Sequence, residues 1–421
     1  MRIALLVNNF PPEVGSAADL FYRLAHEFRK RGHHVEVFTT EPRYYNLGPG
    51  KKSFQLGEKK YKYKIWKVEA MNGIYVYRIK LLPIIYPRSG TTAIFRELEH
   101  ILQPITFTAF IPYLTTYDVI LVYSPPLMLG YIGALIGKYL KIPTVINVQD
   151  IHPEAIVDIG LLRNKFLIYI LEIIERQMYN FASAITVHSD GNREIIIKHG
   201  VDPQKIFTIY NTTYIPPLEL LSKGNIFRQK YSIEGKFIVT YAGIMSFAQD
   251  LDTIIKAAKI VSERDKDILF LLVGDGPTKR DLVTLSKKLA VNNVMFLPFQ
   301  EGDHYWYLLS ASDICLVSLK STVKTPVVPR KLQDIMAAGR PVVANVPPIG
   351  DAAKIVKEAR CGIVVEPESP QELAEIVIKL KNMSKDEREK MGFNGRKYAE
   401  EHFSPQIIAK QYEFIFNNLI K

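Results

Sequence analysis

Residues 327–344, VVPRKLQDIMAAGRPVVA, combine a strand end, a turn, a helix, a second turn and a new strand. Pro329 suits the first turn of a helix, and Gly339 is typical of a helix end. A strand–helix–strand succession of this kind is the repeating unit of a parallel α/β sheet. The helix nevertheless begins with Arg330 and Lys331, where the macrodipole is positive and each cation costs about 0.3–1 kcal/mol. These two cations predict a negatively charged ligand at this helix start.

The composition is that of a folded soluble protein of two or three domains. The chain has 421 residues, with 48% hydrophobic and 23% charged residues and a net charge of +11. Cys315 and Cys361 lie in apolar stretches and are expected to be buried, reduced thiols. The most apolar region, 101–137, has Asp118 as its one charge, but prolines interrupt it. We therefore expect a strand and a helix there rather than a membrane span.

Short apolar runs alternate with amphipathic stretches twice along the chain, and a polar, proline-bearing linker at 212–236 separates the two halves. Strands that are apolar throughout and joined by helices are typical of parallel sheets covered on both faces. The expected fold class is therefore α/β, with two Rossmann-like domains, 1–211 and 237–403, facing across a cleft. The expected strands are RIALLVNN, HVEVFTT, IYVYRIK, DVILVYS, TVINVQ, AITVHS and IFTIYN in the first half, and FIVTYAG, ILFLLVG, VMFLPF, ICLVSL, PVVAN and GIVVEP in the second.

The first strand is followed by NNFPPEVGSAADL, which has one glycine and so lacks the dinucleotide fingerprint G-x-G-x-x-G. Gly15 and Ser16 still open a helix, either to let a ligand approach the backbone or as a plain turn. The chain has neither a Walker motif nor a G-x-S-x-G elbow, which argues against a P-loop enzyme and an α/β-hydrolase.

Two glycine turns in the second half, YAGIMSFAQDLDTII and LLVGDGPTKRDL, each join a strand to a helix. Such turns expose backbone N–H groups and aim helix N-termini at a common edge, although they also favour glycine for structural reasons. With Arg330 and Lys331 on a third helix, the pattern favours a diphosphate. Asp334, three residues beyond Lys331, either accepts hydrogen bonds from ribose hydroxyls or neutralises Lys331.

These motifs together resemble the family 4 glycosyltransferases of the GT-B fold over nearly the whole chain. The matching motifs are PPEVGSAA, VQDIHPEAI, YAGIMSFAQDLD, LLVGDGP, VPRKLQDIMAAGRPVVA and CGIVVEP. The resemblance is closest to the L-fucosamine transferase-like branch of surface-polysaccharide enzymes. It implies transfer of a hexosyl or N-acetylhexosaminyl group from a nucleotide-diphosphate sugar, expected to be a UDP-sugar, to a lipid-linked or envelope glycan acceptor. It further implies retention of configuration, no cofactor, and a terminal helix, 404–421, that packs back on the first domain.

The sequence departs from the family pattern at the donor site. The first acid of the family's two-glutamate motif falls on Pro326 and the second on Asp334, and a lysine that grips the phosphate in many members is Gln249 here. We therefore assign the diphosphate first to Lys331 and then to Arg330. The complete predicted donor site is Gly243, Ser246, Gln249, Gly274, Asp275, Gly276, Arg330, Lys331 and Asp334.

The acceptor side is predicted in the first half. Asp150, His152 and Glu154 gather on one loop, and any of them is a candidate to position or deprotonate the acceptor hydroxyl. His152 equally suits a structural place at a loop–helix junction. In the family pattern, a histidine of the first domain stands just before an aspartate, and this position corresponds to Gln149, before Asp150, rather than to His152. Gly15 and Ser16 complete the predicted acceptor side, whereas Asn211 is expected to make a turn bond.

No metal site is expected. Asp250 and Asp252 spell D-x-D, but they stand at a helix start, where aspartate is a favoured cap. A metal could stabilise the leaving phosphate, but the sequence shows no other aspartate cluster. The N–H groups and cations of the donor site are therefore expected to take that role.

The region 43–88 has eleven basic and two acidic residues with tyrosines and a tryptophan interleaved. An anionic membrane surface is the expected partner, with the protein cytoplasmic and peripheral on the inner face of the cell membrane. Nucleic acid has the same charge complementarity but is not predicted as a partner. A solvated lysine-rich loop or edge hairpin is the alternative without a partner.

Three functions are consistent with these observations. The first is a sugar transferase as described above. The second is a nucleotide-sugar 2-epimerase of the same fold, which would leave the basic region 43–88 without a purpose. The third is a non-enzymatic basic module that binds a membrane or nucleic acid, and it leaves the predicted phosphate site unexplained.

Overall fold

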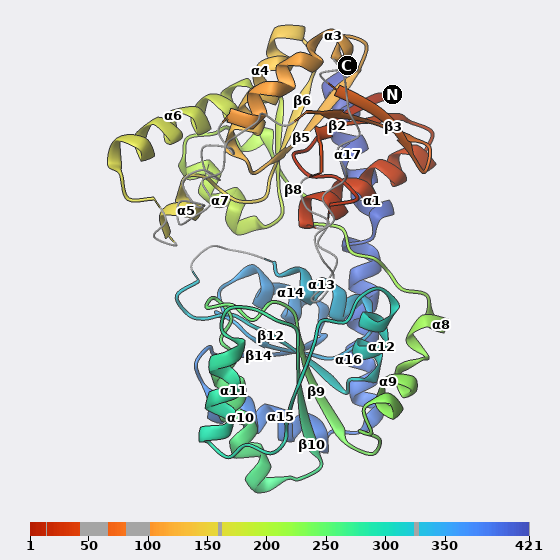
Figure 1. The fold of residues 1–421 in the computed structure, drawn as a ribbon, viewed down its shortest axis with the longest axis vertical. Coiled ribbons are helices and arrows are strands. Elements are labelled where there is room, and N and C mark those ends of the chain that lie inside the picture. The colour runs from red at the N-terminus through yellow and green to blue at the C-terminus, as the bar shows by residue number, and fades with distance from the viewer. Residues whose placement is uncertain (14, 43–65, 81–101, 159–161, 324–327, 421) are drawn as a thin grey trace. The chain divides into compact units, whose positions relative to one another are not determined.

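The computed structural model describes the chain except residues 14, 43–65, 81–101, 159–161, 324–327 and 421. The chain forms two compact units (Figure 1). The first unit comprises residues 1–212 together with 408–421, and the second comprises 213–407. Each unit is an α/β assembly built on one sheet, as the sequence predicts.

The first unit is built on an eight-stranded sheet with the order β3-β4-β2-β1-β5-β6-β7-β8. All neighbouring pairs are parallel except β3 and β4, which form an antiparallel hairpin at the edge. The strands are β1 (Arg2–Leu6), β2 (His34–Thr40), β3 (Trp66–Met71), β4 (Ile74–Ile79), β5 (Val119–Ser124), β6 (Thr144–Val148), β7 (Ala184–Val187) and β8 (Ile206–Thr208).

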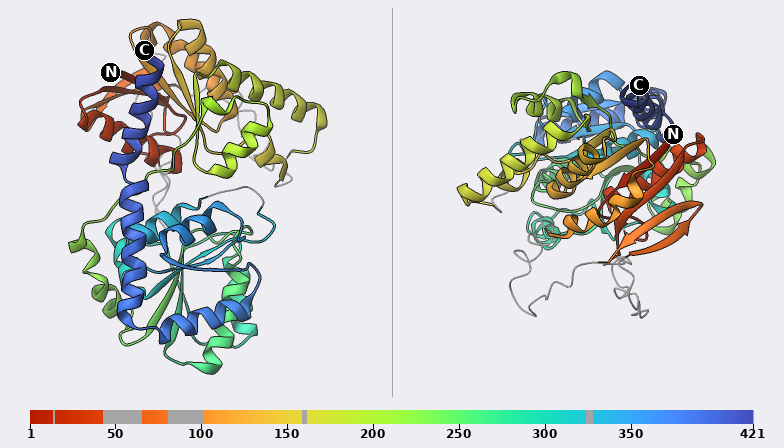
Figure 2. Two further views of the ribbon diagram at one scale, coloured as in Figure 1. Left: turned by 180° about the vertical axis from the view of Figure 1, so that it is seen from behind. Right: turned by 90° about the horizontal axis from the view of Figure 1, so that it is seen from above.

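Helices cover both faces of this sheet, so its central strands β1, β5 and β6 are buried on both sides and contribute to two apolar cores. The final helix contributes to one of them: Tyr412 and Phe416 pack edge-on and tilted against Phe28 of the first helix. Figure 2 shows this last helix and both chain termini in the first unit. The helices are α1 (Ser16–Lys30), α3 (Ile111–Leu114), α4 (Leu127–Leu140), α5 (Glu154–Asp158), α6 (Lys165–Phe181), α7 (Asp190–Lys198) and α17 (Pro405–Ile420), with 3₁₀ turns η1 (Gln103–Phe110) and η2 (Pro203–Lys205).

The second unit is built on a six-stranded parallel sheet with the order β11-β10-β9-β12-β13-β14. The strands are β9 (Phe237–Ala242), β10 (Ile268–Val273), β11 (Val294–Leu297), β12 (Ile314–Ser318), β13 (Val342–Asn345) and β14 (Gly362–Val365). The helices are α8 (Leu218–Leu221), α9 (Gly224–Lys230), α10 (Leu251–Arg264), α11 (Lys279–Lys288), α12 (Asp303–Ala311), α13 (Arg330–Ala337), α14 (Asp351–Ala359), α15 (Pro370–Asn382) and α16 (Lys385–His402).

The segment expected as a linker, 212–236, contains α8 and α9, and from residue 213 it belongs to the second unit. Arg228 of α9 donates hydrogen bonds to the Ala311 carbonyl and the Asp313 carboxylate, at 2.9 and 2.8 Å. A β-carbon on Gly224 would lie 2.7 Å from the Ser310 backbone, so α9 sits directly against α12. Polarity and prolines indicated a linker, but this packing makes most of it part of the second unit.

Every predicted strand is present, and the structure adds β3, the antiparallel partner of β4. Residues 66–79 of the basic region therefore form the edge hairpin that was one alternative, while 43–65 and 81–88 lie outside the described residues. The apolar region 101–137 contains β5 and α4 as expected. Among the described residues, no helix combines the length and apolarity needed to cross a membrane. Cys315 and Cys361 are buried free thiols.

Each sheet reverses its strand order at one point. Strand order turns between β1 and β5 in the first unit and between β9 and β12 in the second. In open parallel sheets, ligands bind beyond the carboxyl ends of the strands at such a point. The loops after these four strands are therefore where each unit, taken by itself, is expected to bind a ligand.

Candidate active site

The side chain of Lys331 lies at the switch point of the second sheet. Lys331 is the second residue of α13, the helix that follows β12. Its Nζ donates hydrogen bonds to Tyr241 Oη at 2.7 Å and to Gln249 Oε1 at 2.8 Å. Tyr241 belongs to β9 and Gln249 to the turn after β9, so the lysine joins the two strands on either side of the strand reversal.

The surroundings of Lys331 are neutral. Its ammonium lies 4.0 Å from the centre of the Tyr241 ring, in the range of a cation–π contact. Among the described residues, neither an Asp nor a Glu forms an ion pair with it. The side chain keeps part of its surface exposed, but burial removes enough water to lower the pKa of Lys331 to about 7. A cation held by neutral groups is a site at which an anion gains strongly.

Gln249 occupies the place of the phosphate-gripping lysine in the family pattern, and the structure shows what replaces that lysine. The Gln249 amide oxygen accepts a hydrogen bond from Lys331, so the ammonium of α13 reaches the side chain at position 249. Gly243, on the same turn, would bring a β-carbon to 3.2 Å from Lys331 Nζ. Lys331 of α13 thus places a positive charge at the turn after β9, where the family pattern has its lysine.

The backbone N–H groups of the glycine turns are largely used within the protein, which corrects the prediction that these turns expose their amides. The N–H groups of Gly243 and Gly274 donate to the carbonyls of Val273 and Leu297, at 2.9 and 3.0 Å. The Gly276 N–H donates to the Asp275 carboxylate at 2.8 Å, so this acid closes its own turn. Most of the positive charge must therefore come from side chains and helix ends.

The glycines themselves are required by close packing between the two turns. A β-carbon on Gly274 would lie 1.9 Å from the Gly243 carbonyl oxygen, and one on Gly276 would lie 2.2 Å from the Met245 carbonyl oxygen. Both residues have positive φ, at 141° and 155°. This favours the structural explanation of these two glycines. Ser246 accepts the Gln249 N–H through its carbonyl at 3.1 Å and so shapes the same turn.

Asp334, one turn after Lys331, is held by two neutral hydroxyl groups. Its carboxylate accepts hydrogen bonds from Thr213 Oγ1 at 2.5 Å and from Tyr305 Oη at 3.3 Å. The pKa of Tyr305 is raised by burial and by this acid. Arg330 is exposed at the first position of α13. The donor-side residues Lys331, Gln249 and Gly243 thus lie together, while Asp334 is fixed one helical turn away.

The D-x-D pair is structural at its first position. Asp250 is buried, and its carboxylate accepts hydrogen bonds from Thr253 Oγ1 and Asn345 Nδ2, each at 2.9 Å, and from the Glu368 N–H at 2.7 Å. It stands at the N-cap of α10 but makes no side-chain cap bond to that helix. Asp252 is exposed in the first turn. The described ranges hold no cluster of three His, Cys, Asp or Glu residues that could bind a metal.

The predicted catalytic residues follow β6 in the first unit. Asp150 is exposed just past the end of β6, and His152 Nδ1 lies 3.3 Å from the Asp150 carbonyl oxygen. Glu154 begins α5 and bonds instead to His199 Nε2 at 3.0 Å. His199 Nδ1 also lies 3.4 Å from Glu175 of α6. Asp150 and His152 therefore remain neighbours, whereas Glu154 is held in a tether between α5, α7 and α6.

This tether is strengthened by protonation of His199. The pKa of His199 is raised by its hydrogen bond with Glu175, against the effect of burial, and further by Glu154. Glu175 is buried and also accepts a hydrogen bond from Tyr179 Oη at 2.8 Å. The loop that holds Asp150 and His152 is thus fixed to the second half of α6.

Gln149, which aligns with the family's histidine, belongs to a buried amide network. Its Nε2 donates to Asn147 Oδ1 at 2.8 Å and to Asn211 Oδ1 at 2.9 Å, and Asn211 Nδ2 donates back to Gln149 Oε1 at 2.6 Å. Asn147 in turn donates to Tyr412 Oη of α17 at 2.9 Å. The network joins β6, residue 211 and the terminal helix, so Asn211 makes a long-range bond rather than a turn bond.

The loop after β1 is pinned by a buried arginine. Arg78 of β4 bonds to Glu69 and to the carbonyl of Pro11, and its side chain is buried. Gly15 and Ser16 follow as exposed residues at the start of α1, and a β-carbon on Gly15 would meet none of the described residues within 4 Å. Within the described part of the chain, the space in front of Gly15 is therefore open, as a close backbone approach by a ligand requires.

Two residues of this candidate site were not predicted from the sequence. Tyr241 was assigned to an apolar strand, FIVTYAG, although a hydroxyl two residues before a glycine turn is a polar group at the carboxyl end of a central strand. His199 lies 45 residues after Glu154. No local pattern could have paired them.

Comparison with known proteins assigns the chain to a family. Residues 15–212 match the family described as glycosyl transferase 4-like domain, and residues 222–398 match glycosyl transferases group 1. The two matches together span most of the chain, which belongs to the family 4 glycosyltransferases of the GT-B fold. These matches favour the first of the three functions set out above.

Relatives of the same length support the assignment. WcaI of Escherichia coli, named as a colanic acid biosynthesis glycosyl transferase, is 23% identical over 98% of each chain. The MMP alpha-(1->4)-mannosyltransferase of Mycolicibacterium hassiacum is 24% identical over 100% of this chain and 98% of its own. The crystal structure of Anabaena HepE in complex with UDP has a TM-score of 0.71 at 20% identity, over 99% of this chain and 100% of that one. That likeness shows the fold.

Proposed function

We propose that this glycosyltransferase moves a hexosyl or N-acetylhexosaminyl group from a UDP-sugar to a lipid-linked or envelope glycan acceptor, with retention of configuration. The observation that carries the donor part is Lys331, a cation at the strand reversal whose hydrogen-bond partners are the neutral oxygens of Tyr241 and Gln249. A diphosphate supplies the negative charge that this position lacks. The structurally similar HepE has been crystallised with UDP and with UDP-glucose, which supports uridine as the base.

The main requirement of the reaction is that the site stabilises the diphosphate leaving group. As the bond from the anomeric carbon to the diphosphate breaks, negative charge grows on the phosphate oxygen, and fixed positive groups stabilise that charge. Lys331 is held in place by two hydrogen bonds, and the positive end of the α13 dipole points the same way. Arg330 is exposed beside it and contributes a second cation. Asp334, fixed by Thr213 and Tyr305, is positioned to accept a ribose hydroxyl.

The acceptor hydroxyl is activated on the first unit in this proposal. Asp150 is exposed at the end of β6, with His152 beside it, and both can take a hydrogen bond from a hydroxyl. The tether through His199 holds their loop in place. With retention of configuration, the departing phosphate itself helps to take the acceptor proton. In this proposal Glu154 does not contact the substrate; through its hydrogen bond with His199 it holds the loop of Asp150 and His152 in position.

The names of the relatives and the net charge support the proposed acceptor and the proposed place of action. WcaI is named for colanic acid biosynthesis and CapM of Staphylococcus aureus for capsular polysaccharide biosynthesis, which supports an envelope glycan or its lipid-linked precursor as acceptor. We propose that the protein works in the cytoplasm, peripheral on the inner face of the membrane, because its net charge of +11 favours an anionic surface.

The decisive experiment is a thermal-shift screen over nucleoside diphosphates and their sugars. A ligand at 100 times its Kd stabilises the folded state by about 2.7 kcal/mol. UDP and at least one UDP-sugar should raise the melting temperature, while ADP and GDP should not. Stabilisation by none of these compounds would refute the donor assignment.

A further inference from the structure

The first half of α6 exposes apolar side chains to solvent. Eight of the ten residues from 165 to 174, KFLIYILEII, are apolar, and none of the ten is buried. Phe166 is 73% exposed, Tyr169 61% and Ile173 42%. These three residues recur at intervals of three and four, so they form one stripe along the helix. Exposed apolar patches of this kind mark interaction surfaces in soluble proteins.

Helix α6 is anchored at its other end. Glu175, Met178 and Tyr179 are its buried residues, and they lie in its second half, where α6 packs against α4. The first half projects from the unit at the left of Figure 1. Since Leu171 and Ile174 still pack against the core from one side, the outward stripe is not a consequence of loose folding.

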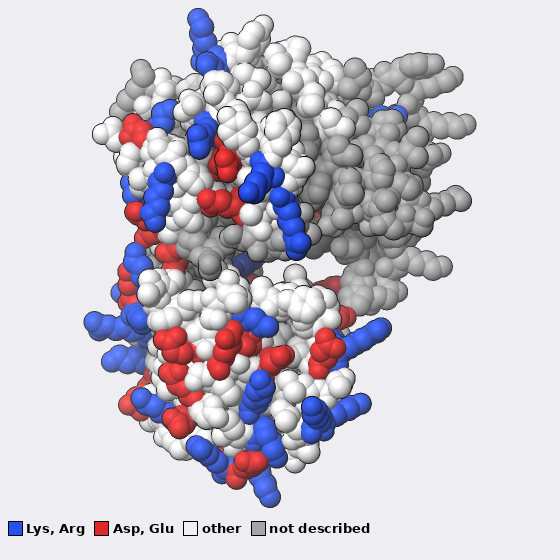
Figure 3. Space-filling model, turned by 90° about the vertical axis from the view of Figure 1, so that its left-hand side faces the viewer, with Lys and Arg blue, Asp and Glu red and all other residues white. Residues whose placement is uncertain are grey.

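Basic residues accompany the apolar stripe. Arg163 and Lys165 are exposed where α6 begins, and Arg176 is exposed about three turns further on. Figure 3 looks onto the side from which α6 projects, and it shows Lys and Arg of the first unit there beside Asp and Glu, with uncharged residues around them. Phe, Tyr and Ile with flanking Lys and Arg are the composition of helices that lie in the headgroup layer of anionic membranes.

We propose that the first half of α6 is a membrane-contact surface that enters the headgroup layer of an anionic bilayer. The inference rests on the proposed lipid-linked acceptor, and it moves the contact from the basic region 43–88 to a surface that the structure describes. A stable contact between two copies of the chain would need about 20–30 residues a side, far more than this stripe offers.

The contact would also orient the acceptor loop. His199 bonds to Glu154 of α5 at 3.0 Å and to Glu175 of α6 at 3.4 Å, so the loop with Asp150 and His152 is tied to the buried half of α6. A helix held at the membrane by its first half thereby fixes that loop at a set height above the lipid. A lipid-linked acceptor would meet the loop without leaving the bilayer.

The test is co-sedimentation of the full chain with phosphatidylcholine vesicles that contain or lack phosphatidylglycerol. The double variant Phe166→Ser/Tyr169→Ser should bind anionic vesicles at least tenfold more weakly than the wild type. The matched control is Phe393→Ser/Phe414→Ser, which changes two phenylalanines that are 66% and 63% exposed on α16 and α17. This control should bind as the wild type does.

The charges provide a second arm. Arg163→Gln/Lys165→Gln should weaken binding to anionic vesicles by about fivefold per charge and leave binding to neutral vesicles unchanged. Lys385→Gln/Lys397→Gln, at exposed positions of α16, serves as its control. A tryptophan at position 169, Tyr169→Trp, should shift its fluorescence to the blue when anionic vesicles are added.

Two results would overturn the proposal. The first is equal binding by the wild type and Phe166→Ser/Tyr169→Ser. The second is a wild-type dimer in light scattering that becomes a monomer in this variant, which would make the stripe a subunit contact. Thermal stabilisation by UDP, measured in parallel, tests the donor assignment separately, because all these variants should keep it.

Discussion

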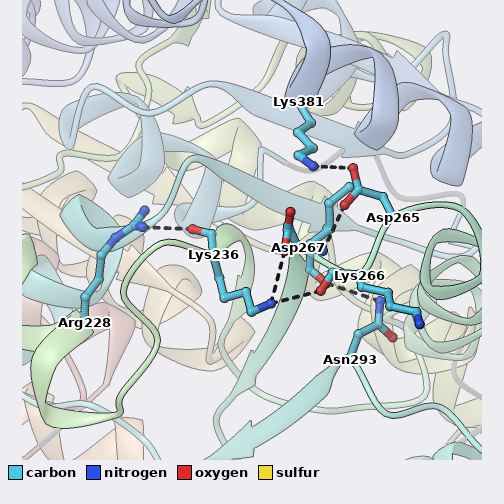
Figure 4. A network of polar contacts seen from close by, with 8 residues as sticks. Arg228, Lys236, Asp265, Lys266, Asp267, Asn293 and Lys381 are labelled. Atoms are coloured by element: carbon cyan, nitrogen blue, oxygen red, sulfur yellow. Dashed lines mark hydrogen bonds and ion pairs between the residues drawn. The ribbon is translucent and has the colours of Figure 1, made fainter.

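Positive side chains at the two edges of the second sheet differ in their partners: carboxylates at one edge, and neutral groups around Lys331 at the other. At the amino-terminal edge, Figure 4 shows Lys236 and Lys381 paired with Asp267 and Asp265. Arg228 on the same edge reaches the Asp313 carboxylate at 2.8 Å. Each of these three cations has a carboxylate partner within the protein, so its charge is balanced without a ligand.

At the carboxyl-terminal edge, Lys331 has the oxygens of Tyr241 and Gln249 and the face of a ring, all of them neutral. A cation without a carboxylate is less stable in the free protein than one with a partner, because desolvation is not offset by an opposite charge. The difference indicates that the position of Lys331 is arranged for an external anion. Changing the charges at the two edges should therefore have different consequences.

The largest expected effect is that of Lys331→Met on UDP binding. Loss of the charged hydrogen bonds to the diphosphate should weaken binding by about 1.5–3 kcal/mol, which is roughly 10- to 150-fold. The free variant should be as stable as the wild type or slightly more stable, because a desolvated cation has left a helix N-terminus. Calorimetric titration with UDP and thermal melting measure the two quantities. A clearly destabilised variant with unchanged UDP affinity would make Lys331 a structural residue.

The matched change at the other edge is Arg228→Met. Arg228 bonds to the carbonyls of Ala311 and Lys236 and to Asp313, and it is partly buried. Its loss should lower the free energy of unfolding by about 1–2 kcal/mol, since part of the interaction is screened by solvent. UDP affinity of the folded variant should not change. A variant with weaker UDP binding but wild-type stability would contradict the contrast between the edges.

The pH dependence sharpens the contrast further. Burial lowers the pKa of Lys331 to about 7, so the ammonium that we propose binds the diphosphate is lost from the free protein as pH rises through 7. UDP affinity should fall about fivefold between pH 7 and pH 8, where a terminal phosphate with a pKa of about 6 is already ionised. Lys331→Arg, whose charge does not titrate, should show no such fall. A flat profile in the wild type would mean that Lys331 stays charged or does not bind the phosphate.

The lowered pKa of Lys331 also determines how the stability of the free protein changes with pH. The unfolded chain holds the Lys331 proton up to about pH 10.5, whereas the folded chain releases it near pH 7. The unfolded state therefore binds more protons between these values, and the stability of the free protein rises with pH across this window. The destabilising contribution of Lys331 is fully present below pH 7. Melting temperatures of the wild type and Lys331→Met should converge as pH rises from 7 to 9.

Patterns along the chain predicted the strands and helices well, because burial on both faces of a parallel sheet leaves continuous apolar runs. They also located Lys331, because a cation at a helix start opposes the dipole. They failed where a residue's partner is distant in sequence. Glu154 looked like a substrate contact until His199 was seen beside it, and the N–H groups of the glycine turns looked free until neighbouring carbonyls were seen to accept them.

The segment 212–236 shows a related limit. Its prolines and polar residues are typical of a linker, yet Arg228 and Gly224 attach α9 to α12 by contacts that span more than 80 residues. Tyr241 shows the opposite case: its identity is visible, but its use is not. A tyrosine in an apolar strand is normally a core residue. Its hydroxyl accepts a hydrogen bond from Lys331 only because the start of α13 packs beside the end of β9, a contact between residues 90 positions apart.

The smallest expected effect is that of a chelator, which should leave UDP affinity unchanged. We propose metal-independent donor binding because the carboxylate of Asp250, the buried acid of the D-x-D pair, already accepts hydrogen bonds from Thr253, Asn345 and the Glu368 N–H. A metal ion would have to displace these donors and separate α10 from the ends of β13 and β14, at a loss of about 1–3 kcal/mol for each buried partner left unsatisfied. Calorimetric titration with UDP in excess EDTA and in excess Mg²⁺ measures the difference. Tighter binding in Mg²⁺ that disappears in Asp252→Asn would show instead that the exposed acid of the pair recruits a metal to the diphosphate.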